Sequence, residues 1–251
     1  MMKGIILAGG TGSRLYPLTK VTNKHLLPVG KKPMIFYPIE KLIEAGIRDI
    51  LIVTGVEYMG DVVGLLGSGK EFGCSFTYKV QDEAGGIAQA LFLAKDFCGQ
   101  SAMAVILGDN IFEDHLEPFV AAFYKQGNGA RLLLKEVSEP GRFGVPVMNG
   151  EKIIRIEEKP REPQSSYAVT GIYMYDHQVF EFIEQCKPSA RGELEITDVN
   201  NFYVHKGLCY YDILKGWWTD AGTFPSLKLA NELVAQNHQP SSITTTYIKR
   251  P

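Results

Sequence analysis

Near its N-terminus the chain carries a short apolar segment that runs directly into a glycine-rich loop and then an arginine. The residues are, in order, Gly4-Ile5-Ile6-Leu7-Ala8-Gly9-Gly10-Thr11-Gly12-Ser13-Arg14-Leu15. Glycines lack a Cβ atom, so they permit turns with positive φ and let backbone N–H groups approach phosphate oxygens. The arginine would add a forked donor with a permanent charge. This order predicts a buried strand followed by a phosphate-binding loop, with a turn and a solvated arginine as the alternative.

Two aspartates occupy positions that suit a hard divalent cation. Asp109 follows the apolar run 103–107 and a single glycine, and Asp220 lies between two tryptophans and a glycine turn. Mg²⁺ prefers one or two carboxylates together with phosphate oxygens. Each aspartate could instead be an ordinary charge at a turn or at a helix start, so the residue types alone leave both readings open.

Three further side chains could contact an anionic ligand or a base. Lys24 precedes His25-Leu26-Leu27-Pro28, and Gln81 ends an alternating run before a Gly85-Gly86 loop, where its amide could pair with a base edge. Lys159 precedes Pro160, which disfavours the helical conformation and predicts an extended segment with Glu158 and Lys159 on opposite faces. The alternatives are solvated lysines and an ordinary polar loop.

Other familiar catalytic patterns are missing from the sequence. The glycine loop has neither the G-x-G-x-x-G spacing of dinucleotide-binding motifs nor the Gly-Lys-Ser/Thr of a P-loop. The five histidines and four cysteines show no metal-like spacing, no C-x-x-C pair and no obvious catalytic triad. We therefore expect reduced, mostly buried thiols, with neither a zinc site nor a nucleophilic triad.

The overall charge excludes a general attraction to polyanions. With 26 basic and 28 acidic residues the net charge is −2, so we expect neither nucleic acid nor membrane as a partner. The start of the chain has too short an apolar run for a signal peptide, and no run of about 18 apolar residues follows. These features predict a cytoplasmic protein.

The elements that would position these residues alternate between strand and helix patterns in the first half of the chain. Apolar or alternating runs occur at 4–8, 50–54, 75–80, 103–107 and 131–134. Helical spacing is shown by Ile35, Ile39, Leu42 and Ile43, and again by Ile87, Leu91, Ala94 and Phe97. This alternation predicts an α/β fold with a doubly wound, mainly parallel, Rossmann-like sheet, in which ligands bind beyond the carboxyl ends of the strands.

The second half has a different pattern. Short β-like runs at 145–148 and 153–157 flank a predicted Asn149-Gly150 turn, and a longer run covers 167–175. Helical patterns follow at 197–206 and in a last helix over about 223–238, with Thr223 as its N-cap. No linker separates the halves, so we expect one domain over residues 1–251, with a mixed sheet.

Taken together, these motifs resemble the sugar-1-phosphate nucleotidyltransferases, and among them most closely the group of glucose-1-phosphate thymidylyltransferases. The resemblance spans Gly4 to about Thr223. It rests on the glycine loop and on Lys24-His25-Leu26-Leu27-Pro28, Gly108-Asp109-Asn110, Glu157-Glu158-Lys159-Pro160, Ala168-Val169-Thr170-Gly171, Arg191-Gly192-Glu193-Leu194-Glu195-Ile196-Thr197-Asp198 and Trp218-Thr219-Asp220-Ala221-Gly222-Thr223.

The resemblance implies a Mg²⁺-dependent reaction in which the phosphate of glucose 1-phosphate attacks the α-phosphorus of dTTP. The products would be dTDP-glucose and pyrophosphate, formed without a covalent enzyme intermediate. Catalysis would then come from aligning two polyanions and neutralising the leaving group. The alternatives are the same chemistry with UTP or another sugar 1-phosphate, and a non-catalytic nucleotide-sugar sensor.

The resemblance also implies roles for individual residues. The catalytic set would be Arg14, Lys24, Asp109 and Lys159. The nucleotide would contact Leu7, Gly9, Gly10, Thr11, Gly12, Ser13, Arg14, Lys24, Gln81 and Gly86. The sugar phosphate would contact Asn110, Gly144, Glu158, Lys159, Thr170, Gly171 and Arg191. Asp109 and Asp220 would hold the metal.

The family pattern further implies a nucleotide-binding half over about 1–137 and a small β-containing sugar-binding half over about 138–223. A homo-oligomer and a supply role for dTDP-rhamnose or another deoxysugar route are also implied. Longer relatives continue past the last helix, so the chain resembles a short form, and we expect weak or absent inhibition by dTDP-rhamnose.

Overall fold

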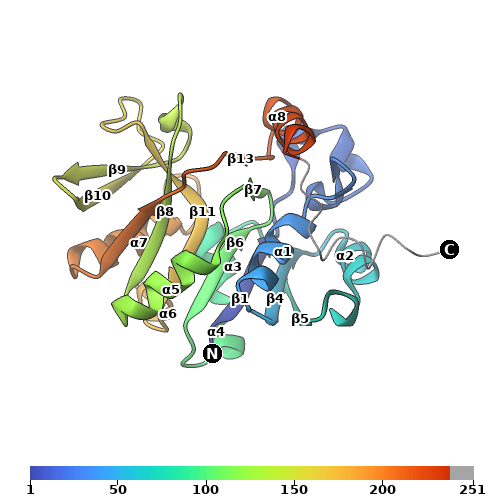
Figure 1. The fold of residues 1–251 in the computed structure, drawn as a ribbon, viewed down its shortest axis with the longest axis horizontal. Helices are drawn as coiled ribbons and strands as arrows, with labels where there is room; N and C mark the ends of the chain where they lie inside the picture. The colour runs from blue at the N-terminus through green and yellow to red at the C-terminus, as the bar shows by residue number, and fades with distance from the viewer. Residues whose placement is uncertain (238–251) are drawn as a thin grey trace.

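A nine-stranded mixed sheet forms the centre of the computed structural model, which describes residues 1–237 (Figure 1). The strand order is β10-β9-β11-β6-β1-β4-β5, and β8 pairs with both β11 and β12. The strands are β1 (Lys3–Ala8), β4 (Asp49–Gly55), β5 (Ser75–Gln81), β6 (Met103–Leu107), β8 (Ala130–Glu136), β9 (Gly144–Asn149), β10 (Lys152–Glu158), β11 (Tyr167–Tyr175) and β12 (Cys209–Ile213).

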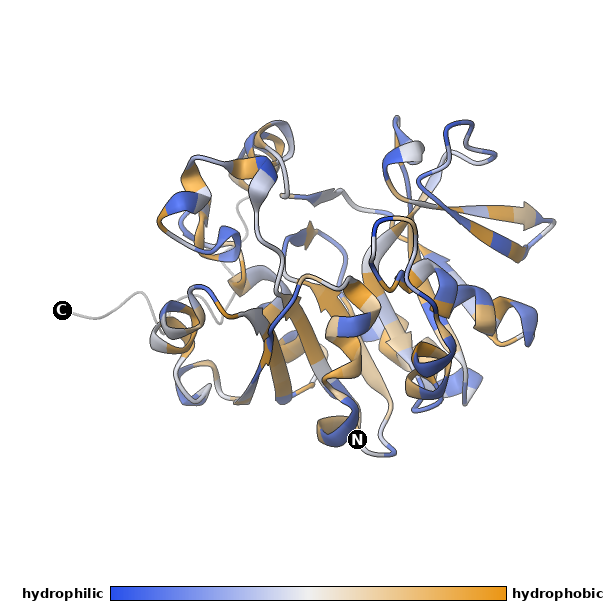
Figure 2. Ribbon diagram, turned by 180° about the vertical axis from the view of Figure 1, so that it is seen from behind, coloured by the Kyte–Doolittle hydropathy of each residue, from blue (hydrophilic) through white to orange (hydrophobic). Residues whose placement is uncertain are grey.

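The N-terminal part of this sheet is parallel and is covered on both faces. β1 lies between β4 and β6, with Ile6 opposite Ile52 on one side and Ile106 on the other. Because side chains alternate along a strand, Ile6 and Ala8 enter one core and Ile5 and Leu7 the other. Burial on both faces explains the continuous apolar runs in the sequence, and these strands are the orange centre of the sheet in Figure 2.

The helices divide between the two cores. The first core takes residues from α1 (Phe36–Glu44), α2 (Met59–Leu66) and α5 (Glu117–Gln126). The second core takes residues from α3 (Ile87–Phe92), α4 (Lys95–Cys98), α6 (Val179–Gln185) and α7 (Ile196–His205). The doubly wound α/β fold predicted from the sequence is therefore confirmed.

The second half adds antiparallel strands to the same sheet. β11 pairs antiparallel with β6, β8 and β9, and β9 with β10, whereas β12 joins β8 in parallel. Gly150 has φ of 60° between β9 and β10, as the predicted Asn149-Gly150 turn requires. The β-containing subregion is therefore continuous with the parallel sheet.

Small ribbons and a last helix cover the end of the sheet at which β1 terminates. β7 (Asn110–Phe112) pairs with β13 (Trp218–Asp220), and β2 (Pro28–Val29) with β3 (Lys32–Pro33). The 3₁₀ turns are Ser13–Leu15, Leu18–Lys20, Lys24–Leu26, Lys70–Phe72 and Pro140–Arg142. The last helix, α8 (Phe224–Gln236), lies beside the N-terminal loops, where Ala230 packs with Leu15 and Val29 (Figure 1).

Thr223 caps this last helix, as predicted, by accepting a hydrogen bond from the Ser226 amide. The predicted helical end at residue 238 lies outside the described residues. None of the helices in residues 1–237 combines the length and the apolar character needed to cross a membrane.

Some local predictions were wrong. The apolar spacing over 87–97 predicts one helix. The structure has two, because the Ala94 amide donates to the Leu91 carbonyl, three residues back, and this tighter turn separates α3 from α4. The spacing thus predicted which face is buried but not where the helix breaks.

The thiols are less buried than predicted. All four cysteines are free, but only Cys98 is buried, whereas Cys74, Cys186 and Cys209 are partly exposed.

Candidate active site

The glycine-rich loop follows β1 at the carboxyl edge of the parallel sheet. Gly12 has φ of 67°, and a Cβ atom there would lie 2.7 Å from Thr19 Cγ2, so glycine is required. The Thr19 hydroxyl donates to the Gly12 carbonyl at 2.9 Å. Leu15 is fully buried, whereas Arg14 is exposed. The loop is therefore anchored after its glycines and leaves Arg14 exposed, and its contact with a phosphate stays a prediction.

Lys24 and Asp109 form a buried ion pair beside this loop. Lys24 Nζ lies 2.5 Å from Asp109 Oδ2, and the two side chains are only 10% and 11% exposed. Burial alone would raise the pKa of Asp109, but the Lys24 charge and hydrogen bonds from Lys24 and Asn110 hold it well below its usual range. Asp109 is therefore ionised at neutral pH.

Asn110 fixes the orientation of Asp109. Its Nδ2 donates to Asp109 Oδ1 at 3.1 Å, and its Oδ1 accepts from the Gly171 amide at 2.9 Å and from Trp218 Nε1 at 2.7 Å. The side chain therefore joins β7, β11 and β13. Its predicted contact with the sugar phosphate stays a prediction, and the structure adds a positioning role.

Asp220 reaches the same place from a distant part of the sequence. It pairs with Asn110 across the β7–β13 ribbon, and the Ala221 amide donates to the Asp109 carbonyl at 2.8 Å. A Cβ atom at Gly222 would lie 3.1 Å from Arg14 Nη2 and 3.2 Å from Asp109 Oδ2. Arg14, Asp109 and the segment after Asp220 therefore converge.

The electrostatics around the two aspartates favour a cation. Burial and repulsion by Asp109 raise the pKa of Asp220 to about 6, against the attraction of Arg142, whose Nη2 lies 3.7 Å from Asp220 Oδ1. Within residues 1–237 no group of three or more His, Cys, Asp or Glu forms a metal site by itself. A cation bound here would need further ligands, which the phosphates of a bound nucleotide and water can supply.

His25 packs behind this pair and does not titrate near neutral pH. Burial and the Lys24 charge lower its pKa to about 3, and its Nδ1 lies 2.7 Å from Asn23 Oδ1. A Cβ atom at Gly108 would meet His25 Cδ2 at 2.7 Å. The neutral imidazole therefore packs as a spacer against the turn that presents Asp109.

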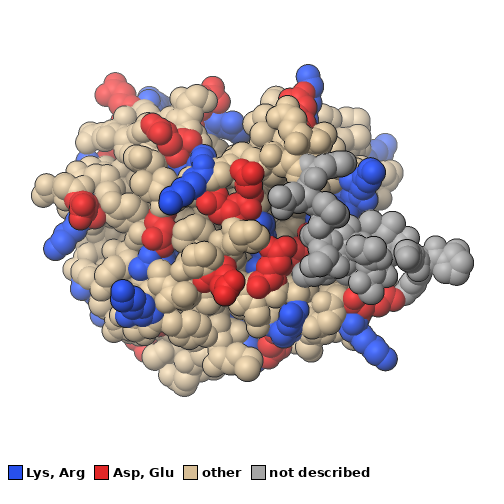
Figure 3. Space-filling model, in the orientation of Figure 1, with Lys and Arg blue, Asp and Glu red and all other residues tan. Residues whose placement is uncertain are grey.

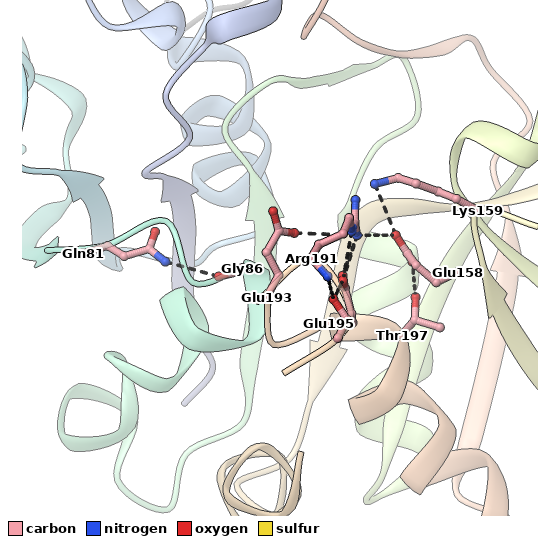
Figure 4. Close-up of polar contacts among 9 residues, drawn as sticks. Gln81, Gly86, Glu158, Lys159, Arg191, Glu193, Glu195 and Thr197 are labelled. Atoms are coloured by element: carbon pink, nitrogen blue, oxygen red, sulfur yellow. Dashed lines mark hydrogen bonds and ion pairs between the residues drawn. The ribbon is translucent and has the colours of Figure 1, made fainter. Parts of the chain in front are cut away.

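Gln81 and Gly86 lie at one end of the site, at the edge of the parallel sheet (Figure 4). Gln81 Nε2 donates to the Gly86 carbonyl at 3.3 Å and to Gln89 Oε1 at 2.8 Å. A Cβ atom at Gly9 would lie 2.4 Å from Gln81 Oε1, so Gln81 reaches the glycine loop. The structure brings these residues together as predicted, and adds Gln89, whose role the sequence did not indicate.

Glu158, Lys159 and Arg191 gather at the other end, where β10 terminates (Figure 4). The predicted extended backbone at Lys159 was wrong, because Lys159 has φ of 45° and its Nζ lies 3.4 Å from Glu158 Oε1. The left-handed bend before Pro160 turns both side chains to the same side. Glu158 Oε2 also accepts from the Thr197 hydroxyl at 2.6 Å.

Arg191 is held by carboxylates on several sides. Its Nη2 donates to Glu195 Oε1 at 2.8 Å and Oε2 at 2.9 Å, and lies 3.3 Å from Glu158 Oε1 and 3.6 Å from Glu193 Oε2. Ser189 in turn donates to Glu195 at 2.7 Å. Glu193 and Glu195 were not predicted as site residues, although they lie in the 191–198 motif.

Two residues predicted to contact the ligands are buried, with their side chains turned into the protein interior. The Thr170 side chain is fully buried, and its hydroxyl donates to the Leu133 carbonyl at 2.7 Å, so it faces β8. Leu7 is 6% exposed and packs in the second core. Gly144 and Gly171 lie closer to the site, since Gly144 pairs with Glu158 and a Cβ atom at Gly171 would lie 2.6 Å from Asn110 Nδ2.

Comparisons with known proteins identify the family of the chain. Residues 3–237 match the model of the nucleotidyl transferase family. The chain belongs to the nucleotidyl transferase family. It is 46% identical to a glucose-1-phosphate thymidylyltransferase of Neisseria meningitidis over 93% of this chain and 82% of that protein. A thymidylyltransferase of Xanthomonas campestris is 44% identical over 92% of this chain and 80% of the relative.

Solved structures share the fold over nearly the whole chain. A putative glucose-1-phosphate thymidylyltransferase from Bacillus anthracis, in complex with a sucrose, has a TM-score of 0.93 and 61% identity, covering 97% of this chain and 99% of its own. A UDP-glucose pyrophosphorylase complexed with UDP-glucose has a TM-score of 0.83 and 26% identity, covering 95% and 100%. Members of the family act on a nucleoside triphosphate and a sugar 1-phosphate and generally use a divalent metal ion.

Proposed function

We propose that the chain transfers a thymidylyl group from dTTP to glucose 1-phosphate, giving dTDP-glucose and pyrophosphate. A phosphate oxygen of the sugar phosphate forms a bond to the α-phosphorus of dTTP, and the bond from that phosphorus to the β-phosphate oxygen breaks. The attacking oxygen is already ionised at neutral pH, so no general base is needed. The observation that carries the proposal is the convergence of Arg14, Lys24, Asp109 and Asp220 at the carboxyl edge of the parallel sheet.

The nucleotide half of the site is assigned to the first part of the chain, up to about residue 137. The Gly9–Gly12 loop with Thr11, Ser13 and Arg14 would hold the phosphates and the departing pyrophosphate. Gln81 and Gly86 would contact the thymine. Both groups lie at the carboxyl ends of parallel strands, β1 and β5, with β4 between them, and ligands of this fold class bind at that edge.

The sugar half is assigned to residues from about 138 to 223. Lys159 and Arg191 would bind the phosphate of glucose 1-phosphate, and Glu158 would bind the sugar. Glu158 and Glu195 now neutralise these cations, so the arriving phosphate must replace some of those contacts. The carboxylate that is released would then be free to accept hydrogen bonds from sugar hydroxyls.

Mg²⁺ is the metal that suits this donor set, with Asp109 and Asp220 as protein ligands. It would supply positive charge to the phosphates as the pyrophosphate leaves. Lys24 is the residue that must change partner, because its ammonium now pairs with Asp109. With Asp109 holding a cation, the Lys24 ammonium would be free to contact the α-phosphate.

The test is pyrophosphate release from dTTP by the purified protein. We expect release only when both glucose 1-phosphate and Mg²⁺ are present, with dTDP-glucose formed in equal amount. Binding of dTDP-glucose without any pyrophosphate release would instead indicate a nucleotide-sugar sensor. Release from dTTP alone would indicate a hydrolase and would contradict the transfer reaction.

A further inference from the structure

The ribbon that carries Asp220 is very short. β7 and β13 pair through only three residues each, with Phe112 opposite Trp218 and Asn110 opposite Asp220. A slip of one residue would turn the Asp220 side chain to the other face of the ribbon, away from Asp109. Three pairs specify a register weakly, so the register must be fixed by contacts outside the ladder.

Two carboxylates at the end of β7 make such contacts with the backbone that precedes β13. Asp114 accepts hydrogen bonds from the Lys215 amide at 3.1 Å and from the Gly216 amide at 2.8 Å. Glu113 accepts one from the Trp217 amide at 3.2 Å, while its own amide donates to the Trp217 carbonyl at 3.0 Å. Three consecutive amides are thus bound by two consecutive carboxylates.

Two lysines bind backbone carbonyls of the same segments. Lys135 Nζ donates to the Gly216 carbonyl at 2.6 Å and to the Leu214 carbonyl at 3.2 Å. Lys41 Nζ donates to the carbonyls of both Glu113 and Asp114 at 2.9 Å. Charge-assisted hydrogen bonds of this kind are stronger than neutral ones, so they favour one alignment of the two segments.

Gly216 shows how close the two segments are. A Cβ atom at this position would lie 2.7 Å from Glu113 Cβ and 2.9 Å from Asp114 Oδ2. A side chain there would push the carboxylates off the backbone. The segment therefore fits around Glu113 and Asp114 in one alignment, and that alignment places Asp220 opposite Asn110.

We propose that Glu113 and Asp114 are positioning residues that set the register of β13 and so place Asp220 beside Asp109 to receive the metal. This proposal rests on the cation site of the proposed function. Neither residue faces the reacting groups, because both bind backbone amides at the opposite end of the ribbon from Asp220. Their effect on catalysis must pass through Asp220.

The test measures Mn²⁺ binding by electron paramagnetic resonance, with Mn²⁺ alone and with Mn²⁺ plus dTTP. We expect Asp114→Ala to weaken Mn²⁺ binding about 10–100-fold, as is typical when a residue supporting a metal ligand is removed. The matched control is Asp212→Asn. Asp212 lies on β12, just before this segment, and forms an ion pair with Arg131 on β8, so the substitution breaks that pair and leaves the β7–β13 ribbon intact. The control should bind Mn²⁺ as the wild type does.

Tryptophan emission gives a second readout. The chain has two tryptophans, Trp217 and Trp218, and both lie in the segment that would shift. We expect Asp114→Ala to change the emission spectrum of the folded protein, whereas Asp212→Asn should not. A role confined to stability would lower the unfolding midpoint while leaving emission and Mn²⁺ affinity unchanged, and that result would overturn the proposal.

Two further variants separate the possible failures. If Asp220→Asn binds Mn²⁺ as tightly as the wild type, the cation site itself is wrongly assigned. If Asp220→Asn loses binding but Asp114→Ala keeps it, only the positioning role is wrong. Should Asp114→Ala not fold, Asp114→Asn replaces one acceptor oxygen at constant shape, and wild-type Mn²⁺ affinity in that variant would refute the proposal equally.

Discussion

Replacing Asp220 by asparagine should stabilise the metal-free protein while removing the metal-dependent activity. The pKa of Asp220 is raised from 3.8 to about 6, so the folded protein disfavours the ionised carboxylate. Protonated Asp220 contributes to the free energy of unfolding. This contribution is fully present below the pKa that Asp220 has in the unfolded chain, and it is lost as pH rises through the folded-state pKa of about 6. Above that pH the wild type keeps an unfavourable charge that Asp220→Asn lacks.

The size of this effect follows from the shift. One pKa unit corresponds to about 1.4 kcal/mol, so a shift of roughly two units sets an upper limit of about 3 kcal/mol. The Asp220 side chain is 17% exposed, so solvent screens its charge only weakly. The attraction of Arg142 lowers the pKa of Asp220 and already opposes part of the upward shift. Asparagine keeps the shape but cannot form the ion pair, and we expect a gain of about 1–3 kcal/mol at pH 8.

The assay is urea unfolding in the presence of a chelator, from pH 4 to pH 8. The stability difference between Asp220→Asn and wild type should be near zero at pH 4 and should grow through pH 6. Added Mg²⁺ should then stabilise the wild type but not the variant, because only the wild type has both carboxylates. Asp212→Asn, which loses its ion pair with Arg131, should gain no stability at any pH.

Two outcomes would refute this reasoning. If Asp220→Asn is no more stable than wild type at pH 8 without metal, the repulsion between the two aspartates is not present. If the variant keeps Mg²⁺-dependent pyrophosphate release, Asp220 is not a metal ligand. Neither outcome depends on the identity of the base or the sugar.

Three other predictions concern the remaining charges and the base. Arg14→Ala should lower kcat for pyrophosphate release by about 10²–10³, with the urea midpoint unchanged because the side chain is exposed; near-wild-type turnover would contradict its role. Lys24→Met should cost about 3–5 kcal/mol in urea unfolding because it leaves Asp109 buried without its partner, and the additional change Asp109→Asn should recover part of the loss. The kcat/KM for dTTP should exceed that for UTP by only about fourfold if the thymine methyl, worth about 0.8 kcal/mol, is the sole difference read; a ratio above about 100 would require a further contact.

The parallel core and the loops at its edge were predictable from the sequence. β1, β4 and β6 are buried on both faces, and such strands appear as uninterrupted apolar runs. Loops that directly follow those runs must lie at one edge of the sheet, which brings the glycine loop and Asp109 together. Local sequence order therefore predicted the position of the residues that we propose contact the nucleotide.

The rest depended on contacts between distant segments. β13 is only three residues long, too short to show a strand pattern, and its partner β7 lies more than a hundred residues earlier. The left-handed conformation of Lys159 is similarly invisible, because the following proline favours an extended backbone at that position. Chain geometry of this kind becomes visible only with the tertiary structure.

The same limit applies to the carboxylates, whose residue type says nothing about their task. Glu195 neutralises an arginine, Asp114 binds backbone amides, and Asp109 faces both a lysine and a second aspartate. Among these four carboxylates, Asp220 is the one left in a state that its surroundings oppose, with a raised pKa and a partner 3.7 Å away. A carboxylate whose charge the folded protein disfavours is the one that gains most from a cation. This imbalance, which the sequence cannot show, is the physical argument for the proposed metal site between Asp109 and Asp220.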